Sequence, residues 1–268
     1  MRRHNFNIFQ ILCGILTLLA VVLIGSNILV ITFRGLFSLS ECFSRPETLF
    51  AVGLSMKSAC VSTLLCFLLA IPTAYMLTRS RILFRPLVEM VLELTMSLPY
   101  LVIGLSLLIL FSSPAGKWLK AMGFPVVFHQ NGIIIAQLVV NLPFAIKLVS
   151  TAFRGVDIKL EYVAGLLGAT PARSFFTILL PLCKNSLISA WILVWSRALG
   201  EFGATLMLVG VTRMKTETLP ASIYLDVSTN DLNGALASAF ILLMISAVSL
   251  GIANFLTRAN RKQGRYES

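Results

Sequence analysis

The chain has 268 residues, of which 57% are hydrophobic and only 12% are charged. A soluble domain carries about 25% charged residues, so this composition excludes an ordinary soluble protein and indicates one that lies in a lipid bilayer. The net charge of +11 does not indicate nucleic acid as a partner, because the basic residues fall in short clusters between apolar runs and do not form one basic stripe.

Six apolar runs are long enough to cross a membrane, since a spanning helix needs about 20 residues. They are residues 4–33, 58–78, 94–116, 121–146, 185–212 and 232–257. The first run follows Arg2 and Arg3 as in a signal peptide, but it is longer and has no small-residue cleavage site at its end, which predicts a retained anchor. We therefore expect an all-α, polytopic membrane protein with six transmembrane helices.

The loops between these runs differ in their content of basic residues. Most of the 22 Lys and Arg residues lie in segments that share one side of the membrane with both termini. Because basic residues concentrate in cytoplasmic loops, the sequence predicts cytoplasmic termini in a plasma or inner membrane protein. The chain then divides into residues 1–50, with the first span and an outer loop, residues 51–257, the transmembrane core, and residues 258–268, a basic cytoplasmic tail.

Prolines interrupt the third and fourth runs. Pro99 lies in Ser-Leu-Pro-Tyr, and Pro143 follows Asn141 in Asn-Leu-Pro-Phe. A proline leaves a backbone carbonyl unpaired, and irregular backbone is tolerated at membrane depth where it meets protein or water. Two interpretations remain open: Pro99, Asn141 and Pro143 line a translocation pathway, or the prolines bend the helices for packing.

The segment 153–185, between the fourth and fifth runs, is too interrupted to span a membrane. Asp157 is placed to cap a short helix, and Gly168 suits the left-handed residue at which such a helix ends. Thr170 can then cap a second helix, with Pro171 at its first position. We expect this second helix to continue into the fifth span.

The first of these two helices carries apolar residues at i, i+3, i+4 and i+7 from Leu160 to Leu167, which predicts one apolar stripe. A helix of this length is about 15 Å long and cannot cross a membrane. A helix that lies on lipid usually has several Lys or Arg on its polar face, whereas this one has Lys159 alone, offset by Glu161. The pattern therefore favours a protein partner over the membrane surface.

The same segment resembles the EAA loop of type-I ABC importer permeases. In that loop Glu-Ala-Ala is followed, after three residues, by Gly and, after nine more, by Ile-x-Leu-Pro. Gly168, Ile178, Leu180 and Pro181 stand at the required spacing, and Ala164 takes the place of the second Ala.

The resemblance departs from the family at the acidic residue. Tyr162 stands at the Glu position, Val163 replaces the first Ala, and Glu161 lies one place earlier. In the family this loop is the coupling helix, which sits in a groove of a cytoplasmic ATPase subunit. The resemblance implies that role for Glu161, Tyr162, Ala164, Leu167, Gly168, Ala169 and Pro181.

The fifth run contains two ionisable residues, Arg197 and Glu201, four positions apart. On one helix they would share a face and neutralise each other. Ionisable groups inside a membrane usually face the bundle interior or water and mark functional sites, so both are candidates for the translocation pathway. A structural ion pair between two spans is the alternative.

Residues 196–210 also resemble the molybdate, tungstate and sulfate permeases, and residues 217–220 (Glu-Thr-Leu-Pro) and 223–224 (Ile-Tyr) look closer to the molybdate and tungstate members. The resemblance covers about residues 50–257. It implies the MetI-like fold, an oxyanion substrate and alternating access. It also implies three kinds of partner, namely a second copy of the chain, two ABC ATPase subunits and an extracytoplasmic binding protein.

The chain offers few residues for a catalytic or metal site. It has only two histidines, His4 and His129, and five scattered cysteines, and the GxxxxGK[ST] phosphate loop does not occur. We therefore expect no catalytic residue, metal or cofactor in this chain, with ATP and Mg²⁺ bound by a partner ATPase. Two alternatives stay open. One is a permease for sulfate or another oxyanion, and the other is an ATPase-independent secondary transporter or channel, against which the lack of an internal repeat argues.

Overall fold

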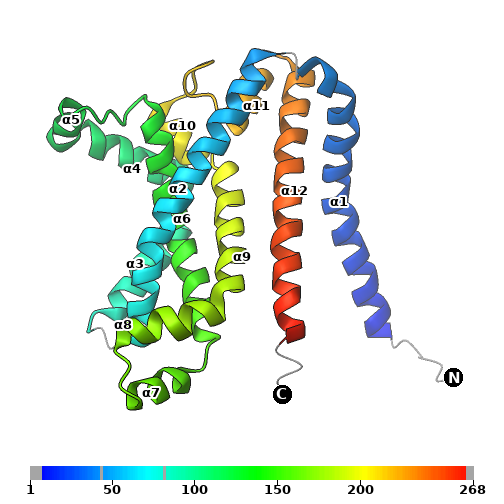
Figure 1. Cartoon of the computed structure of the whole chain (residues 1–268). Coiled ribbons are helices and arrows are strands. Elements are labelled where there is room, and N and C mark those ends of the chain that lie inside the picture. Colours follow the sequence, from blue (N-terminus) through cyan, green and yellow to red (C-terminus); the bar gives the residue numbers. More distant parts are fainter. Residues whose placement is uncertain (1–7, 43–44, 81–82, 264–268) are drawn as a thin grey trace.

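The computed structural model describes residues 8–42, 45–80 and 83–263, and the regular secondary structure in these ranges is helical. Long helices extend between two ends of the molecule (Figure 1). Arg2 and Arg3, and the last part of the predicted basic tail, lie outside the described residues.

Five continuous helices of the described chain are long and apolar enough to cross a membrane. They are α1 (Ile8–Cys42), α2 (Pro46–Arg79), α6 (Gln130–Arg154), the unbroken run of α8 (Pro171–Ser174), η1 (Phe175–Leu179) and α9 (Leu180–Leu199), and α12 (Leu232–Gln263). A sixth candidate span is a pair of helices, α3 (Arg85–Ser97) and α4 (Tyr100–Ser112), bent by 110°. The predicted all-α membrane fold is confirmed.

The third predicted span, 94–116, is not one straight helix. Leu98 has extended backbone dihedrals, because the ring of Pro99 disfavours a helical conformation in the residue before it. The helix therefore stops and restarts at Tyr100 in a new direction. The short helix α5 (Pro114–Ala121) follows α4, so the fourth span begins at Gln130 and not at residue 121.

The fifth predicted span, 185–212, is also broken. Helix α9 ends at Leu199, and the chain turns through Gly200 before α10 (Gly203–Val209) begins. Glycine at both sides of the break lowers the propensity for a continuous helix. Helix α11 (Leu219–Ser228) then leads to α12.

The junction of α8 and α9 is continuous, as predicted, but it contains a π-helical turn, η1. Pro181 lies just after this turn. A proline lacks an N–H and crowds the carbonyl four residues earlier, here that of Thr177 inside η1. The wider turn accommodates the proline without ending the helix.

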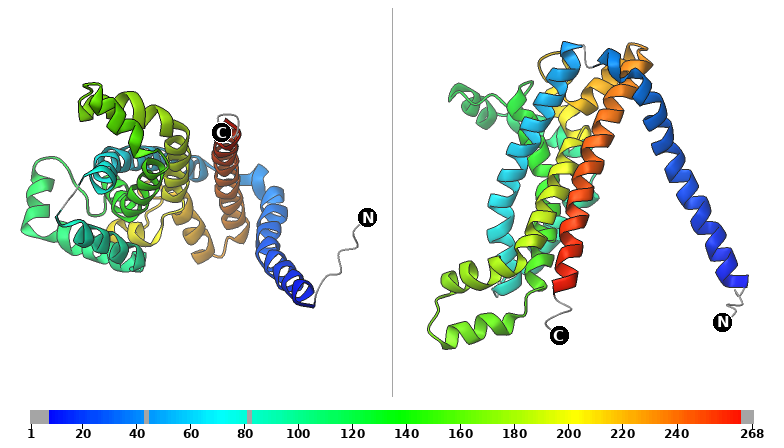
Figure 2. Two further views of the ribbon diagram at one scale, coloured as in Figure 1. Left: turned by 90° about the horizontal axis from the view of Figure 1, so that it is seen from below. Right: turned by 45° about the vertical axis from the view of Figure 1, so that its right-hand side comes forward.

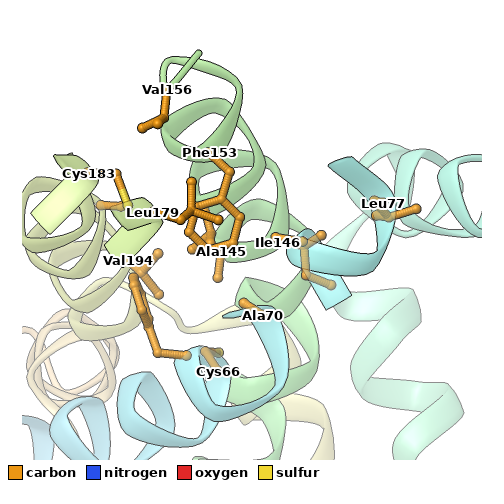
Figure 3. Packing of buried hydrophobic residues seen from close by; sticks show 14 residues of the cluster. Cys66, Ala70, Leu77, Ala145, Ile146, Phe153, Val156, Leu179, Cys183 and Val194 are labelled. Atoms are coloured by element: carbon orange, nitrogen blue, oxygen red, sulfur yellow. The ribbon is translucent and has the colours of Figure 1, made fainter. Parts of the chain in front are cut away.

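The core lies where α2, α6 and α9 pack against one another. Small side chains such as Ala70 and Ala145 let the helices approach, and Phe153, Leu179 and Val194 fill the space between them without solvent exposure (Figure 3). This core holds the segment 153–185 at the end of the bundle.

Helix α1 stands apart from this core. It contacts α12 at Gly35, where a Cβ atom would lie 2.5 Å from that of Phe240, so only glycine permits the approach. From there α1 diverges from the bundle, as Figure 2 shows, and its apolar span is exposed along its length. The start of α1, the end of α12 and helix α7 (Ile158–Leu166) lie at the same end of the molecule, as predicted. We call this the inner end and the opposite one the outer end.

Candidate functional site

Helix α7 projects beyond the spanning helices at the inner end (Figure 1). Its predicted caps are present, since the Asp157 carboxylate accepts a hydrogen bond from the Lys159 N–H at 2.9 Å. Gly168 has φ +87° and reverses the chain. The Thr170 hydroxyl then accepts from the Arg173 N–H at 3.3 Å and opens α8. Each end of this loop is therefore fixed by its own local sequence.

Large apolar side chains on α7 and at its C-cap are exposed. Leu166 is 88% exposed and Leu167 84%, and Tyr162 and Val163 are exposed as well. At about 100° of rotation per residue, these side chains cover a broad arc of the helix. Leu160, Val163 and Leu167 of the predicted apolar stripe are among the exposed residues, and Tyr162 and Leu166 extend it. Exposed apolar surface of this kind marks a contact with a protein or with the membrane. We call Tyr162, Val163, Leu166 and Leu167 the α7 surface.

Glu161 lies on the other side of α7 and faces the protein. Its carboxylate forms an ion pair of 2.7 Å with Nε of Arg79, and the two side chains are only 13% and 8% exposed. Arg79 also donates from Nη2 to the carbonyls of Phe153 (2.7 Å) and Val156 (2.9 Å). The acidic side chain expected at an ATPase contact is thus held inside the chain.

The sequence analysis did not select Arg79 as a site residue and counted it only among the basic residues of the loops. It lies 82 positions before Glu161, so no local pattern joins the two. A cavity of about 200 Å³ lies under α7 between these residues and α8, with Tyr75, Ala169 and the buried Ser174 in its wall. Ala164 is only partly exposed, and so is Ala169.

The predicted ion pair between Arg197 and Glu201 does not form. Because α9 ends at Leu199, the two residues do not share a helix, and the rule for positions four apart does not apply. The Glu201 carboxylate instead accepts from the N–H groups of Ala204 (2.8 Å) and Thr205 (3.3 Å), and from the Thr205 hydroxyl. It therefore caps the first turn of α10.

Arg197 contacts residues next to both candidate prolines. Nη2 donates to the Tyr100 hydroxyl, and the guanidinium carbon lies 4.8 Å from the Phe144 ring centre and 5.7 Å from that of Tyr100. Tyr100 directly follows Pro99, and Phe144 follows Pro143. The structure thus places one of the five predicted pathway residues, Arg197, against the neighbours of two others.

Two buried polar atoms in this region lack a hydrogen-bond partner. They are Nε of Arg197 and Oδ1 of Asn141, whose amide nitrogen donates to the Gln137 carbonyl at 2.8 Å. Buried polar groups are normally paired, so an unpaired donor beside the break in α9 is a place where a polar ligand can bind.

Gln137 is a buried polar residue that the sequence analysis did not select. Its Nε2 donates to the Ala198 carbonyl at 2.9 Å, at the end of α9, and to the Ser58 hydroxyl at 3.3 Å. Its Oε1 accepts from the Ser62 hydroxyl at 3.0 Å. The sequence could have pointed to Gln137, because a glutamine inside an apolar run is unusual in a membrane helix. The side chain of Gln137 joins α2, α6 and the broken end of α9.

The outer end carries a network of ion pairs. Glu217, from the Glu-Thr-Leu-Pro string, is fully buried, and its carboxylate lies 2.8 Å from Nη1 of Arg213. Nη2 of Arg213 donates to the Asp226 carboxylate at 2.5 Å. Nearby, Asp231 pairs with Arg45 at 2.5 Å. A hydrogen bond from the Gly234 N–H, with that from Arg45, lowers the pKa of the Asp231 carboxyl. The network ties the start of α2 to α11 and α12.

The described part of the chain holds no group of three His, Cys, Asp or Glu side chains placed to bind a metal ion. Its features are those of a membrane transport component, with a bundle of helices long and apolar enough to span a bilayer, helix breaks within the candidate spans and an exposed apolar helix at one end. The family described as the binding-protein-dependent transport system inner membrane component matches residues 67–262, and the chain belongs to this family. The resemblance to ABC importer permeases is thereby confirmed.

Several relatives carry transport names. The chain is 38% identical over 211 residues to the "Molybdenum transport system permease protein ModB" of Mycobacterium tuberculosis, covering 77% of this chain and 79% of that protein. It is 33% identical to the protein of the same name from Escherichia coli K12, covering 80% and 95% of the two chains. The "Sulfate transport system permease protein CysT" of Escherichia coli K12 is 30% identical, with coverage of 81% and 79%.

Solved structures share the fold at lower identity. A bacterial ABC transporter involved in the import of the acidic polysaccharide alginate matches with a TM-score of 0.68 and 18% identity, covering 94% of this chain and 95% of that one. The inward-facing MetNI methionine ABC transporter matches with a TM-score of 0.60 and 18% identity, covering 79% and 94%. The predicted MetI-like fold is confirmed.

Proposed function

We propose that this chain is the transmembrane permease subunit of an ATP-driven importer for an oxyanion, most simply molybdate or tungstate. The observation that carries the ATP-driven part is the α7 surface, since a short helix that exposes Leu166 and Leu167 beyond the membrane spans needs a protein partner. The choice of oxyanion is supported by 38% identity to a molybdenum permease, against 30% to a sulfate permease.

The proposed complex contains two copies of this chain, two ABC ATPase subunits and an extracytoplasmic binding protein. A second copy is supported by α3, the first half of the bent span, which exposes Leu87, Met90, Val91 and Leu94 at helical spacing. The α7 surface would sit in the ATPase, which places the inner end, with both termini, in the cytoplasm. In this proposal the chain does no covalent chemistry, and ATP and Mg²⁺ bind to the partner subunit.

The translocation pathway of this proposal runs past the helix breaks at Pro99 and Glu201 and past Pro143, which lies inside the continuous helix α6. Arg197 keeps its positive charge available for a dianion, because the Glu201 carboxylate is used by α10 and the guanidinium Nε has no other partner. Asn141 offers a second unpaired polar atom. In alternating access, ATP-driven movement of α7 opens this route outward, and hydrolysis resets it.

The test is ATP hydrolysis by the co-purified complex, with binding protein loaded with molybdate, tungstate or sulfate. The wild type is compared with Gly168→Trp, which disturbs the seat of α7. Gly123→Trp is the matched control, because Gly123 also has positive φ and open space around it but lies in the loop after α5. We expect molybdate or tungstate to stimulate the wild type and the control but not Gly168→Trp.

Other outcomes would change the assignment. Stimulation by sulfate alone would make the chain a sulfate permease. If no ATPase co-purifies and uptake persists in Gly168→Trp, the chain is a secondary transporter or channel, and the proposed coupling through α7 is refuted.

A further inference from the structure

We propose that Arg79 is a positioning residue that carries the movement of α7 into α2 and holds the end of α6 to the same point. This inference rests on the proposed function, because it concerns how force from an ATPase reaches the spans. It assigns a specific role to a residue that the resemblance to importer permeases did not select.

Arg79 joins three elements at the inner end. It is the last residue of α2, its Nε pairs with Glu161 of α7 at 2.7 Å, and its Nη2 donates to Phe153 and Val156 at the end of α6. The last carbonyls of a helix lack the usual N–H partner within the helix. Arg79 donates to that of Phe153, which also accepts from the Val156 N–H at 3.2 Å, and to that of Val156 just beyond the helix. The planar guanidinium is suited to this fork of acceptors, whereas the single ammonium of lysine is not.

In the described part of the chain, the remaining contacts of α7 lie mainly with elements other than α2, so the Arg79–Glu161 ion pair is the hydrogen-bonded side-chain contact that joins these two helices. Helix α7 packs mainly against α8 and η1, which continue into α9. The outward side of α7 is exposed, and the cavity of about 200 Å³ lies beneath it. A push on α7 reaches α9 through α8 and η1, and it reaches the end of α6 through residues 155–157 of the chain. Arg79 is the side-chain contact that carries it to α2 and holds the end of α6 at the same point.

The burial of the link makes it stiff. The side chains of Arg79 and Glu161 are 8% and 13% exposed, so water competes little for their hydrogen bonds. With the link in place, α2, α6 and α9 follow α7 together. Without it, α7 can tilt into the cavity while the core of the bundle stays still, and ATP is hydrolysed without transport.

The experiment measures oxyanion taken up per ATP hydrolysed by the complex in liposomes, together with the amount of ATPase that co-purifies. The variants are Arg79→Met, Arg79→Lys and Glu161→Gln. Arg85→Met is the matched control, since Arg85 lies at the same end and pairs with Glu89 at 3.0 Å, but both side chains are more than 40% exposed. Exposed pairs of this kind contribute little.

For Arg79→Met and Arg79→Lys we expect uptake per ATP to fall about tenfold, a size typical of coupling between two sites. The loss should be smaller in Glu161→Gln, because glutamine keeps a hydrogen-bond acceptor for Arg79. The control should match the wild type. If Arg79→Met does not assemble, Arg79→Lys and Glu161→Gln decide the question.

Two results would overturn the inference. One is an unchanged uptake per ATP in variants that only give less complex, which means a purely structural role. The other is an equal loss in Arg85→Met, which means a general effect of charge. Failure of the proposed function shows separately, in a wild-type complex that no loaded binding protein stimulates.

Discussion

Replacing Gln137 by leucine tests whether a buried polar link holds the broken end of α9. Leucine is close to glutamine in size but has no polar atoms, so it removes the bonds to the Ala198 carbonyl and to the hydroxyls of Ser58 and Ser62 without opening a large cavity. Gln137 is only 1% exposed, so water does not replace these bonds.

The expected loss follows from the number of bonds and from what remains. Hydrogen bonds between membrane helices contribute about 0.6 kcal/mol each on average, so the three together contribute about 2 kcal/mol. Ser58 and Ser62 each keep a backbone acceptor at 3.2 Å, on Ser55 and Ala59. No hydroxyl is left unpaired, so the larger penalty of about 1–3 kcal/mol for each orphaned polar group does not apply.

The assay is unfolding of the purified chain in mixed micelles, followed by tryptophan fluorescence, for the wild type, Gln137→Leu, Ser62→Ala and the double variant. Ser62→Ala removes one partner, and the double-mutant cycle isolates that bond, for which we expect a coupling of about 0.6 kcal/mol. A Gln137→Leu variant as stable as the wild type, or a coupling near zero, would refute the reasoning.

Three further predictions concern other parts of the molecule. Arg197→Ala should reduce oxyanion uptake about tenfold or more while the complex still assembles. Arg197→Lys should keep part of the uptake, since lysine, like arginine, carries a positive charge that attracts a dianion. Uptake of radiolabelled oxyanion into liposomes checks this, and normal uptake in Arg197→Ala would contradict it. The low pKa of Asp231 means that its contribution to stability is fully present above the unfolded value of about 3.9 and is lost only as pH falls through the lower folded value. The difference in melting temperature between the wild type and Asp231→Asn should therefore stay constant from pH 7 to 5 and shrink below about pH 4, and a difference already lost at pH 5 would count against the Arg45 contact. Leu166→Ser should leave the melting temperature unchanged, because the side chain is 88% exposed, yet it should lower the amount of ATPase that co-purifies; an undiminished yield would mean that the partner does not contact this residue.

Features fixed by neighbouring residues were predictable from the sequence. The carboxylate of Asp157 caps a residue two positions away, Gly168 adopts positive φ by itself, and Thr170 caps a residue three positions away. The apolar runs were equally readable, because the bilayer requires about 20 apolar residues whatever the packing.

Features that depend on distant contacts were not predictable. Arg79 and Glu161 are 82 positions apart, and their pairing follows from how α2 and α6 end side by side. The error at Arg197 and Glu201 has a related cause, since the rule for ion pairs assumes a helix that in fact stops at Leu199. Proline at position 99 predicted a bend, but the angle of 110° is set by the packing of α4 against α10.

The π-helical turn η1 has a consequence for how the inner end can change over evolution. Such a turn holds one residue more than an α-helical turn. It takes up that residue within itself, so the helix before it keeps nearly the direction that an unbroken α-helix would have. Deleting a single residue such as Thr177 would therefore leave the α7 surface pointing much the same way, but it would bring the ring of Pro181 against a carbonyl of a regular helix. A deletion within α9 would instead turn α8 and α7 by about 100° about the helix axis and draw them about 1.5 Å closer. Changes in length should thus be tolerated better at η1 than in the helix that follows it.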